Sequence, residues 1–224
     1  MRRARSTMLT LLAVVLGASG PCAFAQAAPA GQTVDRIVAR VEGDILLLSE
    51  VRELAAYQQL MEGRSQPQDQ LINALIEQWA VRNEAQAARF PASPAADVDA
   101  EVNRIQSGFP TVQAFRDRLA AAGLTPQELR HIVERQLYLE RYLDYKFRPA
   151  VQIDDAAIED YYQHEFVPAL RAQGQTPPLD EVRDRIREVL TQRGITARAD
   201  QWFDETKSRL QIEIIPPPAV EGKP

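Results

Sequence analysis

The chain has 224 residues, of which 45% are hydrophobic and 25% are charged, and its formal net charge is −5. These proportions are typical of a globular protein with one or two domains and exclude a disordered or collagen-like chain. One cysteine and two histidines exclude an internal disulfide, a zinc ribbon and a multi-histidine metal site, and the acidic balance argues against nucleic acid as a partner.

The N-terminus has the three-part layout of a secretory signal peptide, which we place at residues 1–25. Arginines precede an apolar run at residues 8–17 that is too short for a permanent membrane span, and Ala-Phe-Ala follows at 23–25. We expect cleavage after Ala25, or alternatively Ala27, and an exported product without stable membrane insertion; an uncleaved signal anchor is the alternative. Cleavage after Ala25 removes three basic residues, no acidic ones and Cys22, so the net charge falls from −5 to −8.

The rest of the chain divides by composition into three parts. Residues 26–33 are expected to be a flexible leader, residues 34–215 a single helical domain, and residues 216–224 a disordered tail. Within the domain, residues 151–215 supply helices and a strand that complete the N-terminal part, residues 34–150. No period of 20 to 50 residues recurs, so the chain is not a solenoid.

The first predicted elements of the domain are strands. Apolar and polar side chains alternate along residues 34–41, with Ile37, Ala39 and Val41 on one face and arginines on the other. Glu-Gly-Asp at 42–44 is predicted to form a turn, and residues 45–48 the second strand of a hairpin. Residues 210–215 alternate in the same way. Because a lone hairpin is only marginally stable in water, we predict that this last strand joins the hairpin in one antiparallel sheet.

Helical periodicity begins at Ser49, which is expected to cap the first helix, and the apolar positions of that helix are Val51, Leu54, Ala55 and Met61. A break at residues 63–67 precedes a long helix that ends near Pro91. The next two helices are predicted to bury the side chains Val98, Val102 and Ile105, and then Val112, Phe115 and Leu119.

Capping signals mark the later helices. Thr-Pro-Gln-Glu at residues 125–128 is a capping box, and its helix must stop at Arg148-Pro149. Asp154 or Asp155 is expected to cap a helix, and residues 168–178 have the composition of a loop. The apolar stripe from Leu179 to Leu190 is predicted to end at Gly194, where another helix follows. The predicted fold class is therefore mainly α with a small antiparallel sheet.

No catalytic constellation, nucleotide-binding motif or metal site emerges, so we assign no catalytic, cofactor or metal residues. Asp160 and His164 stand four residues apart and could share a cation, but acidic residues at a helix start are better explained by the helix dipole. His131 is expected on a polar helix edge. Tyr138, Tyr142 and Tyr145 form a helical stripe that suits either core packing or an adaptable surface for extended peptides.

Four segments, taken in order, resemble SurA-type periplasmic chaperones, a family with a SurA N-terminal domain. VDRIVARVEGDILLLSEV (34–51) resembles the family's opening strand–turn–strand–helix, and FRDRLAAAGLTPQELRHIVERQLYLERYL (115–143) its next helical segment. VQIDDAAIEDYYQ (151–163) is similar to its Tyr-Tyr segment, and PLDEVRDRIREVLTQRGITARADQWFDETKSRLQIEII (178–215) to its closing helices and strand. The resemblance covers nearly all of the chain after the signal peptide.

The chain departs from the family where a parvulin-type isomerase domain is inserted. Only residues 163–177 occupy that place, and they lack the histidine-bearing strand and Gly-Gly signature of a parvulin. The resemblance therefore implies a protein that is not an enzyme: an ATP-independent periplasmic holdase whose partners are unfolded polypeptides, above all outer-membrane protein precursors. The candidate client-binding residues, in a groove between helices, are Tyr57, Met61, Tyr138, Tyr142 and Tyr145. The alternatives are a residual peptidyl-prolyl isomerase and an assembly subunit with one dedicated partner.

Overall fold

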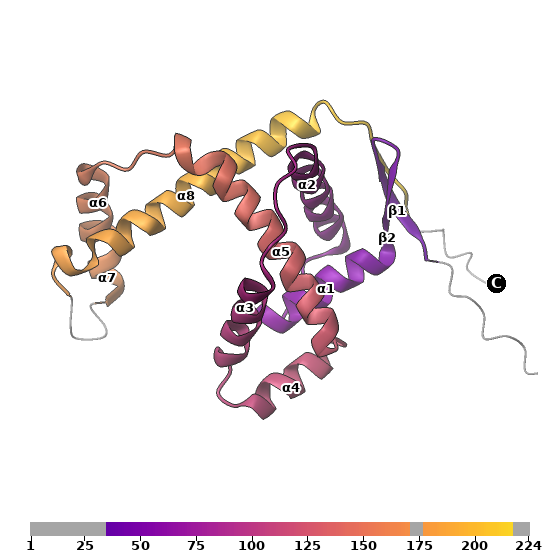
Figure 1. The fold of residues 1–224 in the computed structure, drawn as a ribbon, viewed down its shortest axis with the longest axis horizontal. Helices are drawn as coiled ribbons and strands as arrows, with labels where there is room; N and C mark the ends of the chain where they lie inside the picture. Colours follow the sequence, from indigo (N-terminus) through magenta and orange to yellow (C-terminus); the bar gives the residue numbers. More distant parts are fainter. Residues whose placement is uncertain (1–34, 171–176, 217–224) are drawn as a thin grey trace, which may run out of the picture. The chain divides into compact units, whose positions relative to one another are not determined.

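The computed structural model describes residues 35–170 and 177–216, which are mainly helical and contain a three-stranded antiparallel sheet of order β2-β1-β3 (Figure 1). This confirms the predicted fold class. The expected signal peptide and leader lie outside the described residues, as does the expected tail beyond Pro216.

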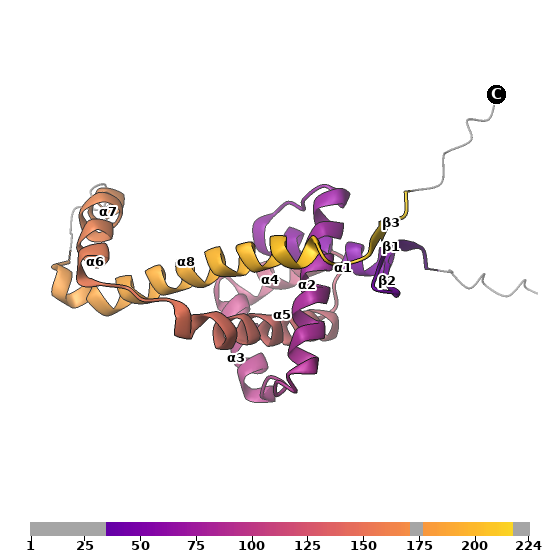
Figure 2. The ribbon, with the colours of Figure 1, turned by 90° about the horizontal axis from the view of Figure 1, so that it is seen from above.

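The sheet brings the two ends of the described chain together. The central strand β1 (Ile37–Val41) pairs with β2 (Asp44–Leu47) on one side and with β3 (Ile212–Ile214) on the other (Figure 2). Arg40 stands opposite Glu213, and their side chains form an ion pair at 2.9 Å. The predicted third strand therefore completes the hairpin, because β1 has a partner on both edges.

The register of β1 corrects the expected alternation. Val38 is fully buried together with Ala39, whereas Ile37 is only half-buried. The pairing with β2 shifts between Ile37 and Ala39, and such an irregularity re-aims the side chains on either side of it. Strict period-two alternation therefore holds only from Ala39 onward.

The helices follow the sheet in the order α1 (Leu48–Glu62), α2 (Gln68–Ala87), α3 (Ala95–Ser107), α4 (Val112–Ala121), α5 (Pro126–Phe147), α6 (Asp155–Tyr161), α7 (Val167–Leu170) and α8 (Leu179–Lys207), with a short 3-10 helix η1 (Arg148–Ala150) and a short π-helix η2 (Tyr162–Phe166). The predicted caps of α5 and α6 are present, and Thr111 caps α4 in the same way: Thr111, Thr125 and Asp154 each accept a hydrogen bond from the third backbone N–H beyond them. The expected cap Ser49 is wrong, because α1 begins at Leu48 and Ser49 is already its second residue. The Ser49 hydroxyl instead donates to Asp35.

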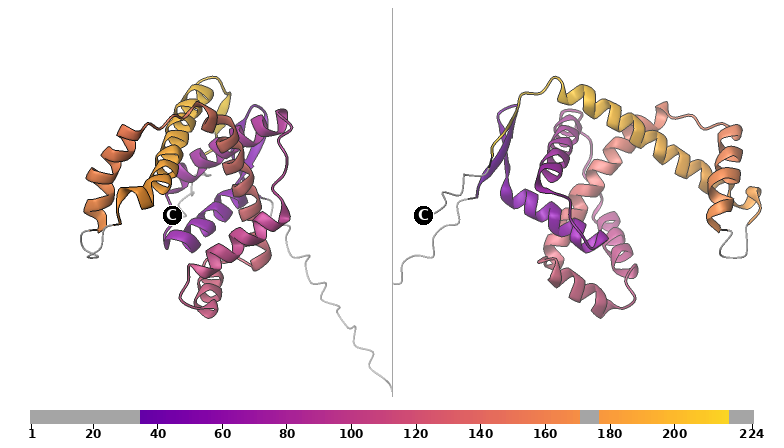
Figure 3. Two further views of the ribbon diagram at one scale, coloured as in Figure 1. Left: turned by 60° about the vertical axis from the view of Figure 1, so that its left-hand side comes forward. Right: turned by 180° about the vertical axis from the view of Figure 1, so that it is seen from behind.

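The buried side chains of the described residues form several hydrophobic clusters. The inner face of the sheet packs on α1 and α2, and a second cluster joins α1 to α3, α4 and α5. The helix α2 packs against both α1 and α5 (Figure 3). The N-terminal half of α8 packs on α6 through Ile158, Val182 and Ile186, while its C-terminal half reaches α2 and α5.

The inward face of α1 changes along its length, which overturns one predicted core position. Val51 and Leu54 face the sheet and α2, whereas Leu60 faces α3, α4 and α5. Met61 is consequently turned outward and is 43% exposed. Val112, the first residue of α4, is also exposed, and Val102 is only half-buried.

Two predicted breaks in the second half of the chain need correction. Of the loop expected at residues 168–178, residues 168–170 are helical and residues 177 and 178 are not, and the residues between lie outside the described part of the chain. The helix that begins at α6 continues through η2 and α7 to Leu170, because Phe166 stacks on Tyr162 with ring centroids 5.9 Å apart and packs into the cluster around Ile158. The second expected break, at Gly194, does not occur, and α8 runs through that residue as one helix of 29 residues. Among the described residues, no helix is long and apolar enough to cross a membrane.

Candidate functional site

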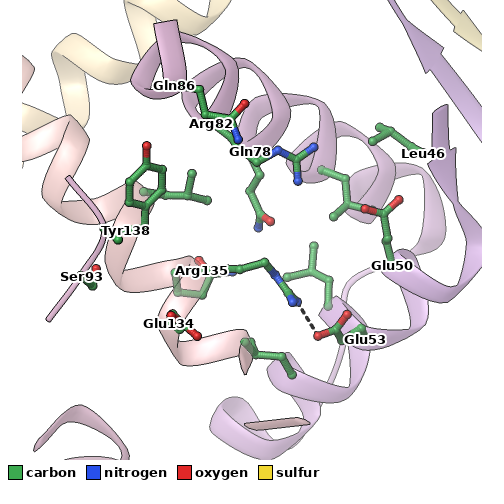
Figure 4. Close-up of a pocket in the computed structure, with 16 residues that line it drawn as sticks. Leu46, Glu50, Glu53, Gln78, Arg82, Gln86, Ser93, Glu134, Arg135 and Tyr138 are labelled. Carbon is green, nitrogen blue, oxygen red and sulfur yellow. Dashed lines mark hydrogen bonds and ion pairs between the residues drawn. The ribbon is translucent and has the colours of Figure 1, made fainter. Parts of the chain in front are cut away.

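A pocket of about 540 Å³ lies between α1, α2 and α5 (Figure 4). Its apolar floor consists of buried side chains that belong to the core clusters: Leu46, Leu54, Leu75, Ile132 and Leu139. A volume of this size and an apolar lining are usual for sites that hold small ligands or a few residues of a polypeptide. The three helices that build the pocket are the longest between residues 35 and 150, and the packing of α1 and α2 on the sheet and of α5 on α2 positions it.

Three glutamines line the pocket: Gln78 and Gln86 from α2, and Gln136 from α5. None of these side-chain amides forms a hydrogen bond with another described residue. A side-chain amide offers N–H donors and a C=O acceptor. It can therefore form hydrogen bonds with the C=O and N–H groups of a polypeptide backbone. The pocket therefore combines an apolar floor with polar groups that can bind a peptide backbone.

An ion pair crosses from α5 to α1 at one side of the pocket. The guanidinium of Arg135 contacts the carboxylate of Glu53, and Figure 4 shows this bridge below the Gln78 side chain. Both residues also line a second hollow of about 700 Å³ between α1 and α5, next to His131. The ion pair is thus a shared wall between two hollows.

The remaining charges around the pocket have different surroundings. The carboxylate of Glu50 accepts a hydrogen bond from the backbone N–H of Leu47 at 2.7 Å, at the start of α1. Glu134 lies 3.8 Å from the His131 ring. Arg82 from α2 is half-buried and forms no ion pair or hydrogen bond through its side chain within residues 35–170 and 177–216.

The predicted tyrosine stripe of α5 converges on one ring. Phe90 lies 5.9 Å from the ring of Tyr138, 5.4 Å from Tyr142 and 5.3 Å from Tyr145, measured between centroids. Of the five candidate client-binding residues, Tyr138 alone lines the pocket. Tyr142 is 4% exposed, whereas Tyr145 is 65% exposed and lies at the surface.

The other two candidates lie apart from this stripe. Tyr57 is half-buried and packs on the cluster between α1, α3, α4 and α5, where burial and then the charge of Glu140 raise the pKa of its hydroxyl. Burial also raises the pKa of Tyr142, with the nearby carboxylate of Glu84 as the next cause. Met61 stands near the C-terminal end of α1 and lines none of the hollows described here. The five residues therefore do not share one groove.

Sequence patterns did not identify Gln78, Arg82, Gln136 or Arg135 as site residues. Each is a polar residue on a predicted helix, and such residues are usually on the solvated face. These residues share a pocket only because α1, α2 and α5 pack around the same space in the folded chain. No signal along the chain marks that meeting.

Asp160 and His164, the pair considered for a cation, do lie together. The Nδ1 atom of His164 is 3.0 Å from an Asp160 carboxylate oxygen and 3.0 Å from the Asp160 carbonyl oxygen, and both side chains are exposed. In the described part of the chain, no group of three or more histidine, cysteine, aspartate and glutamate side chains is placed to hold a metal ion.

No protein-family model matches the chain. A search of curated proteins finds no matching relative.

Proposed function

We propose that the protein is an ATP-independent periplasmic chaperone that binds unfolded exported polypeptides, with outer-membrane protein precursors as its main clients. The pocket between α1, α2 and α5 is the client-binding site. Its apolar floor takes one or two side chains, and the amides of Gln78, Gln86 and Gln136 bind the backbone beside them.

The observation that carries this proposal is the pairing of an apolar floor with amides that have no partner among the described residues. A site for a hydrocarbon ligand needs no such amides, because polar groups left without partners cost free energy when a ligand covers them. The order of four segments resembling SurA-type chaperones supports the same conclusion and supplies the client class. The signal-peptide layout of residues 1–25 supports the compartment.

Weak binding fits the chemistry of the chain. No nucleotide-binding motif is present to drive release, so a client must leave by its own dissociation. A site of about 540 Å³ covers only a few residues of a client, which keeps each contact easily reversible. An acidic net charge helps to keep complexes of the chaperone with apolar clients soluble.

Site-specific photo-crosslinking tests the proposal. A photo-reactive residue in place of Gln86, which is exposed and lines the pocket, should capture many different outer-membrane proteins in the periplasm. The matched control replaces Asn103, an exposed amide on α3 that does not line the pocket. Capture at Asn103 as strong as at Gln86, or no capture at either position, would contradict the proposal.

The two alternatives predict different results. A dedicated assembly subunit would give one abundant cross-linked partner instead of many. A residual prolyl isomerase would accelerate a proline-limited refolding reaction at catalytic concentrations, which the proposed chaperone should not do. Suppression of light scattering when an unfolded outer-membrane protein is diluted from urea is the expected activity of the mature chain.

A further inference from the structure

The Arg82 side chain is the starting point for a more specific assignment of the pocket. Arg82 is a half-buried residue that lines the pocket, and its guanidinium forms no ion pair within 4 Å and no hydrogen bond to another described residue. Figure 4 shows Arg82 and Gln78 side by side on α2, on the side of the pocket opposite Arg135. A guanidinium that has no partner within the protein is free to form charge-assisted hydrogen bonds with an anion that enters the pocket.

The other charges of the pocket do not offer the same opportunity. Glu53 neutralises Arg135 across the pocket wall, and the carboxylate of Glu50 is held by the backbone N–H of Leu47. Of the two arginines that line the pocket, Arg82 is therefore the one available to bind a carboxylate. A planar guanidinium binds a carboxylate through two parallel hydrogen bonds, and the Gln78 amide beside it can donate a third.

The apolar floor restricts where that carboxylate comes from. Leu54, Leu75 and Leu139 line the same pocket as Arg82, so a ligand must present an apolar group close to its negative charge. In the last residue of a polypeptide the carboxylate and the side chain stand on the same Cα atom. An aspartate or glutamate inside a chain carries its charge on the side chain that the floor would have to hold.

The walls of the pocket favour a chain end for a second reason. The Glu53–Arg135 ion pair bounds one side, and Tyr138 lies on another side with the segment that contains Ser93. A polypeptide bound by its middle has to leave such a pocket in two directions, whereas a chain end has to leave in one. A volume of about 540 Å³ suits the last few residues of a chain.

We infer that the pocket binds the carboxyl-terminal end of a client polypeptide, with Arg82 and Gln78 holding the terminal carboxylate and the leucine floor holding an apolar last side chain. This inference rests on the proposed chaperone function and names the part of the client that the pocket selects. It makes Arg82 a specificity-determining residue.

Fluorescence anisotropy with matched peptides tests the inference. One labelled peptide ends in leucine with a free carboxylate, a second has the same sequence with a carboxyl-terminal amide, and a third is amidated but carries aspartate before the leucine. The mature protein should bind the first about tenfold more tightly than either of the others. R82Q should abolish that preference, and R82K, which keeps the charge but loses the paired hydrogen bonds, should retain part of it.

R116Q is the matched control, because Arg116 is an exposed arginine on α4 and does not line the pocket. It should keep the full preference, and circular dichroism should show that all variants remain folded. Equal binding of the free acid and the amide, tight binding of the aspartate peptide, or loss of the preference in R116Q would overturn the inference and leave the chaperone proposal standing. Failure of all three peptides to bind, together with no capture of clients by cross-linking, would instead contradict the chaperone proposal itself.

Discussion

Val151 packs against the bare backbone of Gly194 in the middle of α8. A Cβ atom placed on Gly194 would lie 2.6 Å from the Cγ1 atom of Val151, which is closer than real Cβ contacts allow. The glycine therefore serves close packing between α8 and the segment that follows α5, although its φ angle is not in the left-handed region. This contact explains why a residue that favours a helix end is instead found inside a helix.

We expect Gly194→Ala to destabilise the protein despite the better helix propensity of alanine. The propensity gain is about 0.5–1 kcal/mol, while overpacking against Val151 costs about 1–3 kcal/mol, so the free energy of unfolding should fall by about 1 kcal/mol. In a Val151→Ala background both Cγ atoms are gone, and the same glycine substitution should become stabilising. Urea unfolding of the wild type, the two single variants and the double variant measures this cycle; equal effects in both backgrounds would show that the contact carries no energy.

Acid should weaken the contact between α5 and α8 that surrounds Arg148. Arg148 donates two hydrogen bonds to Glu188, at 2.8 and 3.0 Å, and also binds Asp144. Hydrogen bonding to Arg148, followed by hydrogen bonding to Gln192, lowers the pKa of Glu188 from 4.5 to about 2. Because the folded state has the lower pKa, this stabilisation is fully present above pH 4.5 and is lost as the pH falls toward 2.

The measurement is the unfolding free energy of the wild type and of Glu188→Gln across this pH range. The difference between them should be greatest near neutral pH, at about 1 kcal/mol or less because the pair is exposed, and should shrink as the pH falls toward 2. A constant difference would mean that the Glu188 carboxylate does not carry the effect.

Ile158 anchors α6 on α8 and is fully buried. Ile158→Ala should lower the free energy of unfolding by about 2–5 kcal/mol, because it removes buried atoms and leaves a cavity. Hydrogen exchange should locate the earliest loss of protection in α6 and the N-terminal half of α8. Ile45→Ala, at an exposed isoleucine of β2, is the control and should change stability by less than about 0.5 kcal/mol.

Releasing Arg135 should strengthen the selection of a chain end. Glu53→Gln removes the carboxylate that neutralises Arg135 and leaves a second unpaired guanidinium beside the pocket. Affinity for the free-acid peptide should rise by about threefold to tenfold, while the amidated peptide should be unaffected. Glu101→Gln breaks an ion pair on α3 and should change neither affinity; an equal gain for both peptides would indicate a general change in the pocket instead.

Local signals in the sequence determined where many elements begin and end. The capping box of Thr125 and Glu128, the proline after Arg148 and the cap at Asp154 all act within a few residues, through hydrogen bonds and dihedral angles that neighbours along the chain set. The alternation of the first and last strands likewise predicted the sheet, although β3 buries neither face: Ile212 is half-buried and Ile214 is exposed.

The tertiary structure alone decided the features that depend on which surfaces meet. The face of α1 turns between Val51 and Leu60 because its neighbours change from the sheet and α2 to α3, α4 and α5. The pocket around Arg82 exists because three helices converge, and no residue on one helix specifies the polar residues opposite it. Gly194 stays helical because α8 packs on α6 before this residue and on α2 and α5 after it. This packing outweighs a propensity cost of about 1 kcal/mol.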